Sequence, residues 1–108
     1  MKFDIYIEEG LKALKAMEKH MEIVKKIKEI ALSRVPDAKV YLFGSIIEGK
    51  YTAASDIDVL IITSISKEKA YELKALIYKE IDAPIQLHMA NPSQLQWYTK
   101  FINKMIEV

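Results

Sequence analysis

The stretch LFGSIIEGKYTAASDIDVLII, residues 42–62, joins two apolar strands through a Gly-Ser turn and a polar loop. The second strand opens with Asp56 and Asp58, two positions apart. Alternate residues of a strand point to the same face of a sheet, so the two carboxylates share one face. Paired carboxylates of this kind suit a hard divalent cation such as Mg²⁺.

The Gly44-Ser45 turn supplies the second half of this pattern. It lies where one strand ends and a helical turn begins, so its free N–H groups and its hydroxyl favour an anion such as phosphate. The carboxylates lie one loop away and are followed by apolar residues, where two uncompensated charges are costly. We therefore expect a metal ion and a phosphate that belong to one ligand.

Composition limits the classes of protein to which the chain can belong. With 108 residues, 51% hydrophobic and 29% charged, it is expected to fold as one domain over residues 1–108. The net charge of +1, without a strongly basic segment, argues against nucleic acid as a partner. The absence of cysteine excludes disulfides and thiolate metal sites. Apolar runs are too short to span a membrane and no signal peptide is evident, so a cytoplasmic location is expected.

Hydrophobic periodicity predicts an α/β (α+β) fold, with a small mixed central sheet of about three strands, helices packed mainly on one face and a long N-terminal helix. The expected elements are a helix over 5–35 interrupted at Gly10, strands over 38–43, 56–63 and 85–89, a helical turn over 46–50, a helix over 67–81 capped by Ser66, and a final helix capped by Asn91 that runs to the end of the chain.

The first and last helices carry more apolar surface than one small sheet needs. The first is amphipathic along its length, and the last contains Trp97, Tyr98 and Phe101. These aromatic residues form either a core and interface or a platform on which a base stacks. The surplus apolar surface predicts a homodimer or a hetero-oligomer.

Other chemistries that use an Asp-x-Asp pair fit less well. Phosphatases of the haloacid dehalogenase type place the pair at the exit of a strand, whereas here it opens one. An EF-hand needs further oxygen ligands and a closing glutamate at set spacing, and neither follows Asp58. The G-x-x-x-x-G-K-[ST] motif of a P-loop is absent.

The pattern Gly44-Ser45, ten intervening residues, then Asp56-Ile57-Asp58 resembles the signature of the nucleotidyltransferase superfamily that includes DNA polymerase beta. Gly49 and the Ser55-Asp56 pair agree with that signature, and the matching core runs from residue 39 to 89. The short chain is similar to the minimal nucleotidyltransferase (MNT) branch, so the resemblance implies the nucleotidyltransferase fold.

The resemblance also implies a mechanism. Gly44 and Ser45, together with Ser55, would hold the triphosphate of ATP or another nucleotide, and Asp56 and Asp58 would hold two Mg²⁺ ions. Lys50, in the loop between the two halves of the motif, is within reach of a phosphate by its position. A nucleoside monophosphate would then be transferred to an acceptor. Family members place a third carboxylate on a later strand, where it completes the metal site.

The chain departs from the family at that third position. The strand Ile85-Gln86-Leu87-His88-Met89 offers no acid, and Gln86 stands where the carboxylate is expected. An amide can bind a metal through its oxygen but cannot accept a proton. Glu80 and Asp82 fall at the preceding helix end and turn. His88 is a base or ligand if it shares the face of the two aspartates, and otherwise a structural residue; His20 is expected to be exposed.

Two hypotheses follow. The first is a Mg²⁺-dependent enzyme that transfers AMP from ATP to a HEPN-domain toxin, because the resemblance implies that MNT proteins act as antitoxins for such partners. The second is a nucleotide-binding or interaction subunit that has lost catalysis and neutralises its partner by contact. Gln86 favours the second hypothesis, and the retained Gly-Ser turn and both aspartates favour the first.

Overall fold

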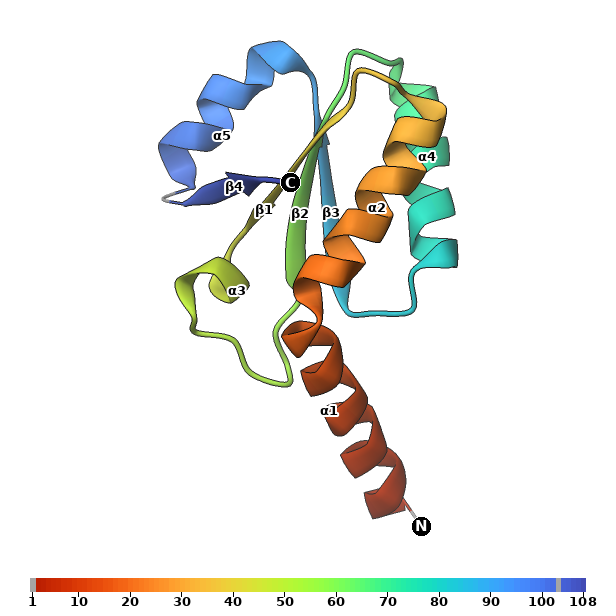
Figure 1. The fold of residues 1–108 in the computed structure, drawn as a ribbon, viewed down its shortest axis with the longest axis vertical. Helices are drawn as coiled ribbons and strands as arrows, with labels where there is room; N and C mark the ends of the chain where they lie inside the picture. Colours follow the sequence, from red (N-terminus) through yellow and green to blue (C-terminus); the bar gives the residue numbers. More distant parts are fainter. Residues whose placement is uncertain (1, 103) are drawn as a thin grey trace.

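The computed structural model describes residues 2–102 and 104–108, with side chains for all of these except residues 2–6, 16 and 101. In chain order its elements are α1 (Lys2–Glu18), α2 (His20–Arg34), β1 (Lys39–Phe43), α3 (Ser45–Glu48), β2 (Ile57–Ile62), α4 (Lys67–Glu80), β3 (Ile85–Ala90), the 3₁₀ helix η1 (Pro92–Gln94), α5 (Leu95–Phe101) and β4 (Met105–Glu107), as Figure 1 shows.

The strands form one mixed sheet in the order β3-β2-β1-β4. β2 pairs antiparallel with β1 and parallel with β3, so that Asp58 lies between Phe43 on one side and Gln86 on the other. A parallel pair needs a crossover connection, which α4 provides between β2 and β3. The predicted fold class is confirmed, with four strands in place of about three.

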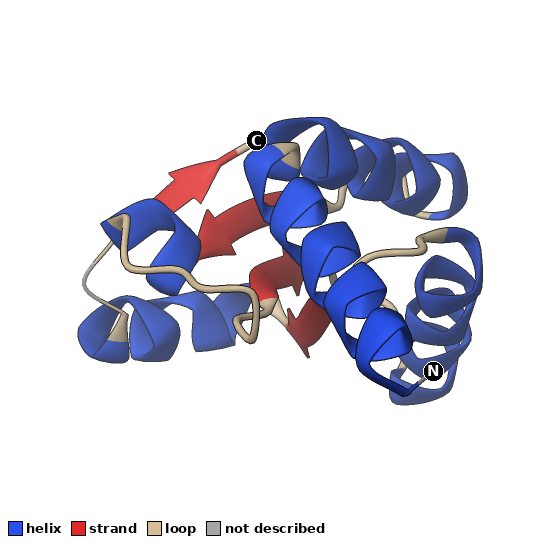
Figure 2. Ribbon diagram, turned by 90° about the horizontal axis from the view of Figure 1, so that it is seen from below, coloured by secondary structure: helices blue, strands red, loops and turns tan. Residues whose placement is uncertain are grey.

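Helices cover both faces of the sheet unequally (Figure 2). α2 and α4 pack on one face through Val24, Ile27 and Ala31 of α2 and Leu73 and Ile77 of α4, the apolar stripes that periodicity predicts. Those stripes meet the inward side of the strands, of which Val40, Leu42, Val59 and Ile61 are fully buried. The shorter α5 packs on the other face, where Leu95 and Tyr98 contact a small cluster around Leu60 and Ile62.

Local capping explains where two of the helices begin. The hydroxyl oxygen of Ser66 accepts a hydrogen bond from the Lys69 N–H (3.3 Å), as predicted for the start of α4. Asn91 caps η1 by accepting from the Gln94 N–H (3.0 Å), while the Gln94 side chain accepts from the Asn91 N–H (2.9 Å). Each cap satisfies helix donors that otherwise lack partners, so both starts could be predicted from sequence.

The break in the N-terminal helix lies at Lys19 rather than at Gly10, so the predicted interruption at Gly10 is wrong. Gly10 remains helical because a glycine inside a helix costs only about 1 kcal/mol relative to alanine. At the actual break, Nδ1 of His20 lies 3.0 Å from the Met17 carbonyl oxygen. His20 is therefore half-buried and engaged with the backbone, not simply exposed as expected.

The break lets α2 lie on the sheet while α1 projects beyond it, which Figure 1 shows at the N-terminal end. Met17 is fully buried, but Ile7, Leu11, Leu14 and Met21 are exposed. The structure ties α1 to the body by an ion pair between Lys12 and Asp82 (2.9 Å). Most of the apolar stripe of α1 thus remains uncovered within this chain.

The prediction of a helix that runs to the chain end is also wrong. α5 ends at Phe101, and residues 105–107 form β4, which pairs antiparallel with β1. The N–H of Val108 donates to the Val40 carbonyl (2.8 Å), and Nζ of Lys28 donates to the Val108 carbonyl. The backbone groups on the outer edge of β1 need partners, and β4 supplies them. No helix in the described part of the chain is both long and apolar enough to span a bilayer.

Candidate functional site

The turn after β1 is shaped by the contact between Gly44 and Asp58. Gly44 has φ of 84° and ψ of −158°, a conformation that is essentially restricted to glycine. A Cβ atom at Gly44 would lie 2.2 Å from Oδ2 of Asp58. The carboxylate therefore packs directly on the backbone of the turn, and only glycine permits this approach.

Ser45 begins the single turn of α3, which the sequence predicts as a helical turn. The Gly44 carbonyl accepts from the N–H groups of Ile47 (3.1 Å) and Glu48 (3.2 Å), and Gly49 closes the turn with φ of 71°. Ser45 is half-buried at the end of the sheet that also carries Asp56 and Asp58. This arrangement places a hydroxyl and the start of a helical turn beside the carboxylates.

The loop from Lys50 to Asp56 is held by its own hydrogen bonds. Oγ of Ser55 accepts from the Thr52 N–H (2.9 Å), and Oγ1 of Thr52 accepts from the Ala54 N–H (3.2 Å). Ser55 thus organises the turn that delivers the chain to Asp56. Lys50 is exposed on the same loop.

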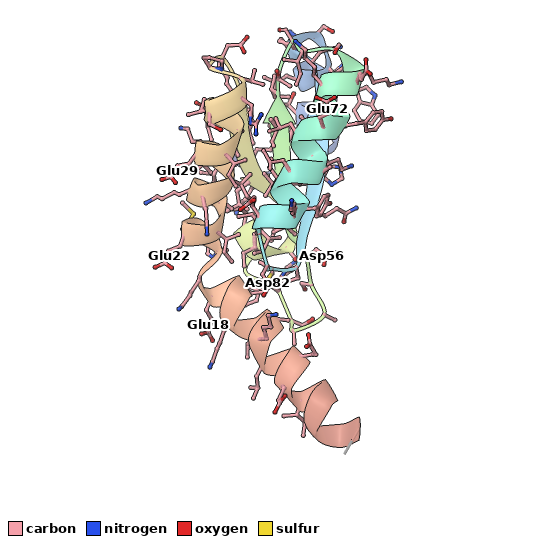
Figure 3. The ribbon with its side chains drawn as sticks, turned by 90° about the vertical axis from the view of Figure 1, so that its right-hand side faces the viewer. Glu18, Glu22, Glu29, Asp56, Glu72 and Asp82 are labelled. Atoms are coloured by element: carbon pink, nitrogen blue, oxygen red, sulfur yellow. The ribbon has the colours of Figure 1, made fainter. Side chains whose placement is uncertain are left out.

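The two aspartates differ in burial. Asp56 is exposed and lies directly before β2, which begins one residue later than expected (Figure 3), whereas only 23% of the Asp58 side chain is exposed. Burial raises the pKa of the Asp58 carboxyl above its usual value, and the charge of Asp56 adds to the rise, while His88 opposes it. An ionised Asp58 is thus a group that a bound cation would stabilise.

The third strand brings two candidates to this face. Gln86 lies beside Asp58 in the register of β2 and β3, and it is exposed. His88 lies one row further, yet its Nε2 is 3.8 Å from Oδ1 of Asp58. The ring of His88 contacts that of Phe43, with centroids 5.3 Å apart. His88 therefore shares the face of the aspartates, which was the condition for a functional interpretation.

Neither remaining acid joins the site. Asp82 pairs with Lys12, and Glu80 lies exposed at the end of α4, as their sequence positions indicate. Trp97 and Tyr98 lie edge to face on α5 (centroids 5.1 Å apart), where they line a shallow hollow with Ser93 and Gln94. The side chain of Phe101, the third predicted aromatic, lies outside the described side chains.

A cavity of about 480 Å³ lies between the end of α2 and α4, and neither aspartate lines it. Its lining combines Arg34, Lys69 and Glu72 with apolar residues such as Leu73. Asp56 is exposed and the Asp58 side chain is 23% exposed, so a ligand that brings its own phosphates and metal ions can reach both.

The described side chains fit a metal that arrives with a nucleotide. Among them no three histidine or acidic groups are gathered closely enough to hold a metal ion by themselves. Mg²⁺ in nucleotide sites uses one or two carboxylates, substrate phosphates and water in place of a full protein cage. Asp56 and Asp58 supply the two carboxylates, and the turn that would take the phosphates touches Asp58.

Two features of the site were not predicted from sequence. One is the packing of Asp58 on Gly44, and the other is the contact of Phe43 with His88. Both depend on the pairing of β1 with β2, where Phe43 lies opposite Asp58. The only signal in the sequence was the apolar strand that runs directly into glycine.

Comparisons with known proteins agree with this geometry. The sequence pattern of the nucleotidyltransferase domain family matches residues 24–106. A crystal structure of a "putative nucleotidyltransferase" is 34% identical with a TM-score of 0.69, covering 82% of this chain and 97% of that one. No curated protein matches the chain.

A second crystal structure, of a "putative nucleotidyltransferase" from Sulfolobus solfataricus, is 20% identical with a TM-score of 0.63. The match covers 89% of this chain and 85% of the Sulfolobus solfataricus chain, and at this identity it supports the fold alone. The family match spans the Gly-Ser turn, both aspartates and all of the sheet except the last residue of β4. The chain therefore belongs to the nucleotidyltransferase domain family, with the fold of a minimal member.

Proposed function

We propose that the protein transfers AMP from ATP to an acceptor in a reaction that depends on Mg²⁺. The observation that carries the proposal is the direct packing of the Asp58 carboxylate on Gly44. Because of that contact, the half of the site suited to phosphate and the half suited to metal meet at one point. A nucleoside triphosphate with its bound cations requires both halves together.

In this proposal the chain binds and orients the reactants. Gly44 and Ser45 hold the triphosphate, aided by Lys50 and Ser55 from the loop, and Asp56 and Asp58 hold two Mg²⁺ ions. Bound Mg²⁺ would neutralise phosphate charge and favour in-line displacement. The acceptor oxygen forms a bond to the α-phosphorus as the bond to the bridging oxygen breaks and pyrophosphate leaves. The amide of Gln86 cannot accept the acceptor proton, which would pass to solvent.

A protein acceptor is consistent with the exposed surface of α1. The exposed side chains of Ile7, Leu11 and Leu14 form an apolar stripe beside the body of the fold. Stripes of this kind mark interaction surfaces. Together with the resemblance to MNT proteins, the stripe supports a HEPN-domain toxin as the acceptor and an antitoxin role. The stripe equally supports assembly as a homodimer or hetero-oligomer, for which we propose a cytoplasmic location.

A second candidate function rests on Gln86. Because Gln86, rather than an acid, lies beside Asp58 in the register, the protein would be a nucleotide-binding or interaction subunit without catalysis. Such a subunit would neutralise its partner by contact through α1. The two functions differ in whether label moves from the nucleotide to the partner.

The test incubates the protein with Mg²⁺, ATP labelled at the α-phosphate and a HEPN-domain protein as the proposed acceptor. Loss of about 3 kcal/mol of metal stabilisation corresponds to about 100-fold in rate, so Asp56→Asn should reduce transfer by at least that factor. Asp37→Asn is the matched control, because Asp37 is exposed in the turn between α2 and β1. Absence of label from the wild-type reaction would leave the contact function in its place.

A further inference from the structure

His88 is the group on β3 that reaches Asp58. Gln86 is the lateral neighbour of Asp58 in the register, but it is exposed, and none of its described contacts involves Asp58. His88 pairs with Leu60, one row further along the same face, and its Nε2 still approaches Oδ1 of Asp58 to 3.8 Å. The imidazole is thus directed toward the carboxylate.

The separation of 3.8 Å is too long for a direct hydrogen bond. An N–H···O hydrogen bond joins atoms about 2.7–3.2 Å apart. Two neighbouring ligand atoms that each lie about 2.1 Å from one ion are about 3.0–3.4 Å apart in octahedral or tetrahedral geometry. Nε2 and Oδ1 therefore have to approach each other by only about 0.4–0.8 Å to share an ion.

The ring of His88 is held in this position yet remains reachable. Its contact with Phe43, with the two rings tilted by 56°, limits rotation of the imidazole. The side chains of His88 and Asp58 are 31% and 23% exposed, respectively, so an ion from solvent can enter between them. Phe43 and Asp58 are themselves opposed in the β1–β2 register, which ties all three side chains to adjacent strands.

We propose that Nε2 of His88 and the carboxylate of Asp58 are ligands of the same divalent ion, and that His88 makes the site prefer a first-row transition ion over Mg²⁺. The inference rests on the proposed function, because it concerns the ion nearer to Asp58 in that site. Carboxylate and water ligands suit Mg²⁺, whereas an imidazole ligand strengthens the binding of transition ions. His88 thereby supplies the ligand from β3 that was expected of Gln86, and phosphate and water oxygens complete the coordination.

The experiment measures metal binding rather than catalysis. Mn²⁺ is titrated into the purified, metal-free protein together with inorganic triphosphate, which supplies the phosphates of a nucleotide without its nitrogen atoms. Binding is followed by electron paramagnetic resonance, and pulsed measurements record coupling to a coordinated imidazole nitrogen. The wild type should show that coupling, and Mg²⁺ should displace Mn²⁺ only in large excess. His88→Ala should abolish the coupling and weaken Mn²⁺ binding by about 10–100-fold, while Mg²⁺ affinity changes far less.

His20→Ala is the matched control, because His20 is the only other histidine of the chain and lies on α2, where it contacts the Met17 carbonyl. It should retain the coupling. Gln86→Ala should retain it too. Absence of nitrogen coupling in wild-type protein that binds Mn²⁺ would overturn the inference without reliance on any variant. If His88→Ala weakened the binding of Mn²⁺ and of Mg²⁺ equally, the proposed preference for a transition ion would be overturned.

The outcome separates this inference from the proposed function. If Asp58→Asn abolishes binding of Mn²⁺ and label transfer, but His88→Ala leaves Mn²⁺ affinity unchanged, the inference fails and nucleotidyl transfer stands. If His88→Ala removes the coupling while no label transfer occurs in any protein, the metal inference stands and the catalytic function fails.

Discussion

Gly44 has the most demanding backbone position in the described chain. Its φ of 84° and the approach of Asp58 combine strain with a steric clash for any other residue. We expect Gly44→Ala to lower the free energy of unfolding by about 1–3 kcal/mol, as measured by urea denaturation, because the strained conformation must be kept or Asp58 displaced. Gly44→Ala should also weaken nucleotide binding.

Gly49→Ala is the control for this prediction. Gly49 also has positive φ (71°), but a Cβ atom there would meet nothing within 4 Å. Gly49→Ala should therefore lower the free energy of unfolding by only about 1–2 kcal/mol, the cost of the left-handed conformation. Nucleotide binding should be retained. Equal effects of the two substitutions on nucleotide binding would show that the Asp58 contact has no role in the site.

Asp58 should make stability depend on pH. Burial raises its pKa in the folded protein, so the folded state binds the proton more tightly than the unfolded state does. Ionisation therefore costs stability as pH rises through and above the unfolded value of 3.8. We expect metal-free Asp58→Asn protein to have a higher Tm than the wild type at pH 7. The difference should vanish below pH 3.8.

We expect addition of a divalent ion to reverse this difference in Tm. An ion that binds the Asp58 carboxylate would stabilise only the folded wild-type protein, because that ligand is absent from the variant. At pH 7 the wild-type Tm should rise with metal concentration while that of Asp58→Asn stays constant. A lower Tm for the metal-free variant at every pH would contradict a raised pKa for Asp58.

At the scale of elements, β4 contributes to stability by covering the edge of β1. Removal of residues 104–108 leaves the Val40 carbonyl without the Val108 N–H and exposes a strand edge. Each backbone hydrogen bond contributes a net stabilisation of about 1 kcal/mol, so we expect the free energy of unfolding, measured by urea denaturation, to fall by about 2–3 kcal/mol. The truncated protein should also tend to associate through the open edge of β1.

Ile106→Ala serves as the control for β4. The side chain of Ile106 is 48% exposed, and its substitution leaves the backbone pairing with Leu42 intact. Ile106→Ala should therefore lower the free energy of unfolding much less than removal of residues 104–108 does. A truncated protein as stable as the full chain would show that β1 tolerates an open edge.

At the scale of the whole molecule, the uncovered stripe of α1 predicts association. A charge placed at its centre, Leu11→Glu, should prevent assembly of the protein with itself or with the proposed HEPN-domain partner, because burial of an unpaired charge is costly. Light scattering after gel filtration measures this directly. The matched control is Tyr71→Glu, since Tyr71 is exposed on α4 away from the stripe. Assembly that survives Leu11→Glu would exclude α1 as the interface.

Features that depend on neighbouring residues could be predicted from the sequence alone. The strand, the Gly-Ser turn, the Asp-x-Asp pair and the caps at Ser66 and Asn91 each follow from local backbone chemistry or spacing. These local features lie in order along residues 42–62 and beyond, and they correctly indicated the family. Only the tertiary structure shows which of these features are in contact.

Features that depend on distant residues required the fold. Residues 105–107 continue the helical periodicity of α5, yet they form a strand because β1 presents an open edge more than 60 positions earlier. The imidazole of His88 approaches Asp58 from one row beyond Gln86, because the strand pairing and Phe43 direct its ring there. Hydrogen-bonding edges and side-chain packing are non-local, so local sequence pattern specified the parts of the site, and the arrangement of the strands decided which of them touch.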